Sequence, residues 1–87
     1  MIDLQDMLSD LELLVNTESP SLDIPRLTAS ATVLAELLER RLGRPAQIID
    51  GPRGPHVLWQ GGGSPKVLIV GHHDTVFPVG TVAARPF

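Results

Sequence analysis

The run Val67-Leu68-Ile69-Val70 is the feature that most constrains the fold of this chain. Four consecutive apolar residues, three of them β-branched, are typical of a strand that is buried on both faces. Such a strand needs a packed layer on each side. The two helices predicted upstream can scarcely cover both faces and still bury their own apolar stripes. We therefore expect the 87 residues to be part of a longer α/β domain.

Apolar periodicity predicts two amphipathic helices in the first half of the chain. Residues 4–15 carry apolar side chains at the i, i+3, i+4, i+7 spacing, and Asp3 can serve as the N-cap of this helix. A second helix is expected over residues 24–42. Asp23 can cap its start, and Gly43 can end it.

The period changes in the second half of the chain. Residues 46–49 and 56–59 are short β-prone runs, separated by a Pro/Gly-rich turn. The apolar run at 66–70 predicts a third strand, and residues 72–87 are expected to be an irregular tail. The predicted order is helix, helix, strand, strand, strand.

Composition excludes several classes of protein. The net charge of −3, with no basic stripe, argues against a nucleic-acid partner. The absence of cysteine leaves only His and carboxylate side chains to hold a metal. No apolar run approaches the ~20 residues that span a bilayer, and the acidic N-terminus does not resemble a signal peptide. We therefore expect a cytoplasmic protein without a membrane partner, and an aliphatic core because aromatic residues are scarce.

The predicted third strand leads directly into His72, His73 and Asp74. In open α/β sheets, ligands gather outside the carboxyl ends of the strands. Residues two apart in an extended chain point to the same side, so we expect His72 beside Asp74 and His73 on the opposite side. A metal-bound imidazole usually donates its second N–H to an oxygen, often a carboxylate. This spacing favours His72 as a metal ligand and Asp74 as the group that orients it.

A capped turn is the competing interpretation of the same three residues. In that case the imidazoles of His72 and His73 would bond to backbone groups and hold no metal. One His and one Asp cannot make a closed zinc site, which takes three or four ligands. For His73, an exposed or packing position is favoured over a role as second ligand.

The stretch from Val67 to Val76, followed by Gly80 and Arg85-Pro86-Phe87, resembles the first signature of a zinc-dependent hydrolase family. This family contains aminoacylases, acetylornithine and succinyl-diaminopimelate deacylases, and glutamate carboxypeptidases. Its signature is an apolar strand, then His-x-Asp-Thr/Val-Val, then a Pro-Phe. The Glu18-Ser19-Pro20-Ser21 segment, the long helix and the strand pair are also similar, so the resemblance covers essentially the whole chain. The glutamate carboxypeptidase branch is favoured because no Trp shortly precedes Pro86.

The resemblance implies that residues 1–87 are the N-terminal part of a three-layer zinc-peptidase catalytic domain with a mixed central sheet. It implies two zinc ions, one of them bound by His72, and it places Asp74 among the catalytic residues as the partner of His72. The zinc pair would polarise an amide carbonyl and activate a water molecule. The implied substrate is a small peptide or an acyl-amino acid, including one with a C-terminal acidic residue. Members of the family carry a further lid or dimerisation domain, so the complete protein could be a homodimer.

By the same resemblance, the other zinc ligands and the general base lie beyond Phe87. We therefore expect the 87-residue segment alone to bind zinc weakly and to hydrolyse nothing. Two alternatives stay open: a stand-alone binding or interaction module, and a homologue of the family that has lost its metals.

Overall fold

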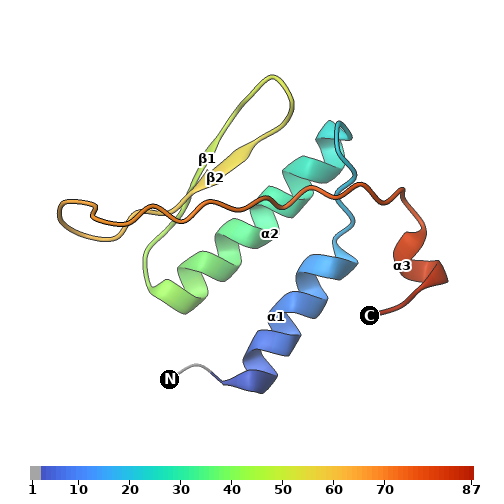
Figure 1. The fold of residues 1–87 in the computed structure, drawn as a ribbon, viewed down its shortest axis with the longest axis horizontal. Helices are drawn as coiled ribbons and strands as arrows, with labels where there is room; N and C mark the ends of the chain where they lie inside the picture. The colour runs from blue at the N-terminus through green and yellow to red at the C-terminus, as the bar shows by residue number, and fades with distance from the viewer. Residues whose placement is uncertain (1–2) are drawn as a thin grey trace.

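The computed structural model describes residues 3–87 as a small mixed α/β arrangement of helices and a two-stranded antiparallel sheet (Figure 1). Its elements in chain order are α1 (Leu4–Asn16), α2 (Ile24–Leu42), β1 (Gln47–Ile49), β2 (His56–Leu58) and α3 (Thr81–Ala84). The molecule is a thin slab of 43 × 35 × 18 Å. None of its described helices is long and apolar enough to cross a bilayer.

The two long helices begin where their capping residues predict. The side chain of Asp3 accepts hydrogen bonds from the backbone N–H groups of Gln5 and Asp6 at the start of α1. Asp23 does the same for Arg26 in α2, and Gly43 ends that helix at φ 80°, a left-handed conformation that glycine adopts without steric cost. The predicted bounds of α2 are confirmed.

The core is small, aliphatic and centred on α2, as the scarcity of aromatic residues predicts. Its buried apolar side chains are Leu27, Ala31 and Leu37. The hairpin of β1 and β2 contacts α2 and pairs Ile48 opposite Val57. In contrast, α1 has no buried residue, so its apolar stripe forms part of the surface.

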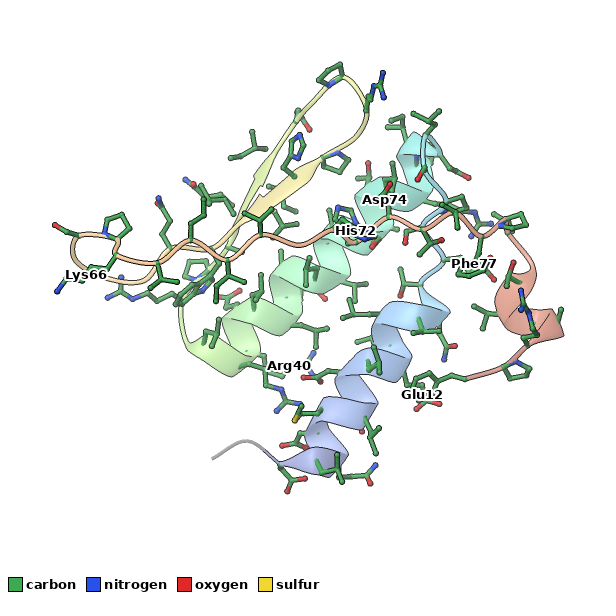
Figure 2. The ribbon with its side chains drawn as sticks, viewed as in Figure 1. Glu12, Arg40, Lys66, His72, Asp74 and Phe77 are labelled. Atoms are coloured by element: carbon green, nitrogen blue, oxygen red, sulfur yellow. The ribbon has the colours of Figure 1, made fainter. Side chains whose placement is uncertain are left out.

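The predicted strand at residues 66–70 is wrong for this structure. The segment forms no strand, and its apolar side chains from Val67 to Val70 are 79% to 90% exposed. A strand is stabilised by hydrogen bonds to a neighbouring strand. Within residues 3–87, β1 and β2 pair only with each other, so residues 66–70 run as an unpaired trace before the chain reaches His72 (Figures 1 and 2).

The predicted irregular tail contains one short helix, α3. Its first turn is held by a residue from the other end of the chain: the Glu18 carboxylate accepts hydrogen bonds from the backbone N of Gly80 at 2.8 Å and of Val82 at 3.3 Å. The helix N-terminus favours such a negative charge. The prediction missed α3 because its capping group is far away in the sequence.

Candidate functional site

The backbone on either side of Asp74 is paired with the loop that joins α1 to α2. The N–H of Thr75 donates to the carbonyl of Ser19 at 2.8 Å, and the N–H of Ser21 donates to the carbonyl of Thr75 at 2.9 Å. These bonds form an isolated parallel bridge between Pro20 and Thr75. The buried hydroxyl of Ser19 adds a bond to the carbonyl of His73 at 2.7 Å. Residues 19–21 thereby hold the backbone of residues 73–75, which are distant in sequence, in a fixed position.

The structure brings His72 and Asp74 together. The Nδ1 atom of His72 lies 2.9 Å from the carbonyl oxygen of Asp74 and 3.2 Å from its Oδ1 (Figure 2). Both oxygens are acceptors, so Nδ1 carries a proton, and in the neutral ring Nε2 has the lone pair. The side chain of His72 is 82% exposed, and the described residues offer its Nε2 no hydrogen-bond partner. The neutral ring can therefore bind a metal through Nε2.

The carboxylate of Asp74 is divided between two partners. Its Oδ2 accepts a hydrogen bond of 2.6 Å from the hydroxyl of Ser21, while its Oδ1 faces His72. The Ser21 hydrogen bond is the main cause that lowers the pKa of Asp74 below its ordinary value; His72 adds a smaller lowering, and burial opposes both. Asp74 is therefore an anionic acceptor at neutral pH.

His73 points to the opposite side and has both ring nitrogens engaged. Its Nε2 lies 3.3 Å from the carbonyl oxygen of Pro55, and its Nδ1 lies 3.0 Å from the hydroxyl of Ser30. A carbonyl oxygen only accepts, so Nε2 carries the proton and Nδ1 accepts from Ser30. The ring thus connects α2 to the loop before β2. In this arrangement it has no lone pair free for a metal.

A cavity of about 530 Å³ lies beside His72, between the two long helices and the C-terminal tail. Its walls are mainly apolar and include Leu14 of α1, Leu34 of α2 and Phe77. Arg85 also lines the cavity, with its guanidinium 5.7 Å from the centre of the Phe77 ring. Ligand-binding cavities commonly have this volume and combine apolar walls with a few polar groups.

The side chains around His72 do not form a complete metal site within the described residues. Within residues 3–87, no group of three or more His, Cys, Asp or Glu side chains is arranged to hold a metal ion. A zinc site takes three or four ligands. His72 offers a single nitrogen, and Asp74 a single carboxylate beside it, which is fewer groups than such a site needs.

Ser21 is the site residue that reasoning from local sequence missed. It belongs to the Glu18-Ser19-Pro20-Ser21 segment on which the resemblance partly depends, but no local pattern points to its partner. Asp74 lies 53 residues away in the sequence. Only the tertiary pairing of the two segments reveals the contact.

No family model matches the chain, and neither a curated protein nor a solved structure is significantly similar to it. The resemblance to zinc-dependent hydrolases therefore depends on the motif residues themselves. Any proposal of function must therefore start from the contacts between His72 and Asp74.

Proposed function

We propose that this chain supplies the first metal ligand of a zinc-dependent amidohydrolase or peptidase, with Nε2 of His72 as the ligand and Asp74 as its orienting partner. One observation carries the proposal: Nδ1 of His72 is hydrogen-bonded to the backbone carbonyl of Asp74 and lies 3.2 Å from its Oδ1, while Nε2 of the neutral ring has a free lone pair in an exposed position. Metal-binding histidines typically have their second nitrogen engaged in this way.

The task of these residues is to hold and orient one imidazole. When bound, a zinc pair would polarise the scissile amide carbonyl and lower the pKa of a water molecule. Asp74 fixes the tautomer of His72, and its negative charge makes the ring a stronger ligand. The proposed substrate is a small peptide or acyl-amino acid, with a C-terminal acidic residue favoured by the resemblance to glutamate carboxypeptidases.

The proposed architecture is the N-terminal part, residues 1–87, of a three-layer catalytic domain with a mixed central sheet. The exposed run from Val67 to Val70 supports it, because this sequence suits the interior of a sheet. The unburied apolar stripe of α1 supports it as well. Both surfaces would be covered in a larger domain.

The same exposed run favours a second candidate function. An extended, unpaired segment can bind a strand of another protein by β-strand addition. A stand-alone interaction module would use residues 67–70 in this way and would not need the free Nε2 of His72. Metal binding at His72 therefore distinguishes the two candidates.

A zinc titration of the 87-residue chain, followed through the side-chain NMR signals of its histidines, tests the proposal. We expect weak binding at Nε2 of His72 that is lost on dialysis, because a single protein ligand cannot retain zinc. His72→Ala should remove it. His56→Ala, which alters an exposed histidine of β2, should not. Zinc binding that persists unchanged in His72→Ala would contradict the ligand assignment.

Asp74→Asn separates the orienting role from the ligand role. In an enzyme that contains this segment, we expect it to lower zinc affinity or turnover by ~10–100-fold, the usual loss when a group that orients a ligand is removed. His72→Ala should abolish hydrolysis of acyl-amino acids and of peptides with a C-terminal Glu. Full activity of His72→Ala would exclude the proposed function.

A further inference from the structure

We propose that Ser21 is a positioning residue of this site: its hydroxyl fixes the Asp74 carboxylate so that His72 keeps Nε2 free for a metal. The inference rests on the proposed function. It adds a residue that lies outside the His-x-Asp motif, in the loop between the two long helices. The hydrogen bonds, the backbone of the loop and the chemistry of the imidazole each support it.

The hydroxyl of Ser21 has two acceptors within reach. It lies 2.6 Å from Oδ2 of Asp74 and 3.2 Å from the carbonyl oxygen of Thr75. A hydroxyl has a single proton, and a bond to a carboxylate at this short distance is charge-assisted and the stronger of the two. The proton therefore belongs to the bond with Asp74, and this bond leaves Oδ1 to face His72.

The backbone of the loop holds Ser21 in place. Its N–H is bonded to Thr75, and the N–H of Asp23 donates to the carbonyl of Pro20 at 3.1 Å, which closes a turn. Leu22 in this turn has φ 73°, and it is the one non-glycine residue with positive φ in the described part of the chain. Such strained conformations persist where the surrounding structure holds them, and they concentrate at functional sites.

Loss of the hydroxyl would free the carboxylate to turn. The side chain of Asp74 is 42% exposed, so water can take the place of Ser21 without holding the carboxylate in one direction. Nδ1 of His72 would then keep the backbone carbonyl of Asp74, 2.9 Å away, as its one fixed acceptor. Without the carboxylate held beside it, a proton on Nδ1 would be less strongly favoured over a proton on Nε2. Each ring with its proton on Nε2 is unable to bind a metal through that atom.

Three substitutions at Ser21, made in the 87-residue chain, test this role. Ser21→Ala removes the hydroxyl, Ser21→Val has the shape of threonine without a hydroxyl, and Ser21→Thr keeps the hydroxyl. The measurements are the imidazole ¹⁵N shifts of His72, which report its tautomer, and the affinity for Zn²⁺. We expect Ala and Val to give a larger share of the tautomer with its proton on Nε2, and up to about tenfold weaker binding of Zn²⁺. Thr should stay close to the wild type.

Ser19→Ala is the matched control, because Ser19 donates to the backbone carbonyl of His73 in the same pair of segments and does not touch Asp74. Its His72 tautomer should be unchanged. Unaltered tautomer and Zn²⁺ affinity in both Ser21→Ala and Ser21→Val would overturn the proposal, as would an equal change in Ser19→Ala.

The tautomer also separates this inference from the proposed function. If His72→Ala leaves Zn²⁺ binding intact, the ligand assignment fails, and a tautomer shift in Ser21→Ala still demonstrates positioning of the ring. If His72→Ala removes binding and the Ser21 variants behave as wild type, only the role of Ser21 fails.

Discussion

His72 and His73 are adjacent in sequence, but their rings lie in opposite surroundings. His72 is exposed and bonded through one nitrogen, whereas His73 is partly buried and bonded through both. The alternation of an extended chain accounts for this difference. Removing the two rings should therefore have different effects. Without the His72 ring the chain loses a candidate metal ligand, and without the His73 ring it loses stability.

We expect His73→Ala to lower the free energy of unfolding by about 1–3 kcal/mol, because it leaves a buried hydroxyl without a partner. That hydroxyl belongs to Ser30, which is 2% exposed. Urea unfolding followed by circular dichroism measures the change. His56→Ala, in an exposed position of β2, should have a much smaller effect. Equal losses in both variants would contradict a structural role for His73.

For individual residues of the site, the relation between His72 and Asp74 could be predicted from the sequence, and the role of Ser21 could not. The side shared by His72 and Asp74 follows from a spacing of two residues, a local property of the chain. The contact of Ser21 with Asp74 depends on the pairing of two remote segments, for which the sequence carries no local signal.

The helices and strands that are specified by nearby residues were predicted correctly. Those that depend on contacts with residues distant in sequence were not. α2 is specified by its own caps at Asp23 and Gly43, so its bounds follow from the sequence. The run at 66–70 has the composition of a strand, but a strand also needs a neighbour to pair with. α3 is held by Glu18, more than sixty residues upstream, and composition does not reveal that contact.

The hairpin loop packs closely on α2 at Gly54. A Cβ atom at this position would lie 2.9 Å from Cδ1 of Leu27, and φ is +126°. We expect Gly54→Ala to cost about 1–3 kcal/mol of stability through overpacking and backbone strain, measured by urea unfolding. Gly63→Ala is the matched control, because Gly63 also has positive φ (+79°) but no atom near its Cβ position. A loss in Gly63→Ala as large as that in Gly54→Ala would contradict the role of the Leu27 contact.

α1 and α2 are connected by a bidentate ion pair. Nε and Nη2 of Arg41 donate to the two carboxylate oxygens of Asp10 at 2.8 and 2.9 Å. The hydrogen bond from Arg41 lowers the pKa of Asp10 below its ordinary value of 3.8. The folded state therefore binds this proton less readily than the unfolded state. The stabilisation is present above the ordinary pKa and is lost as the pH falls through the lowered value.

Asp10→Asn should accordingly lower the urea midpoint at neutral pH and reduce the loss of stability that acidification causes. The effect should shrink at high salt, since the pair is at the surface. Glu12→Gln on the same helix is the control, because the structure shows no ion pair for Glu12 among the described residues. If Asp10→Asn and the wild type lose stability in parallel on acidification, the pair contributes nothing.

As a whole, the molecule is a thin slab with two large uncovered apolar surfaces, the stripe of α1 and the run at 67–70. Exposed strand-forming segments without charge or proline promote association between chains. We expect the isolated chain to self-associate with rising concentration, as measured by light scattering. Ile69→Lys, at a position that is 90% exposed, should reduce this association without altering the helical circular dichroism.

Val76→Lys is the matched control for that prediction. Val76 is 89% exposed but lies outside the apolar run. It should leave association largely unchanged, because Val76 does not belong to the strand-forming run at 67–70. If both lysine variants reduce association equally, added charge is the cause and the run is not the contact.

The bridge between Pro20 and Thr75 also bears on the order in which the chain folds. The helices and the hairpin depend on contacts between residues near in sequence, which form quickly. The bond between Ser21 and Asp74 closes a loop of 53 residues, and the entropy of that closure opposes it until the intervening elements are compact. The contacts among Ser21, Asp74 and His72 should therefore form last. During synthesis they can form only after the segment around Asp74 has left the ribosome. The tautomer of His72 would then be a late marker of completed folding.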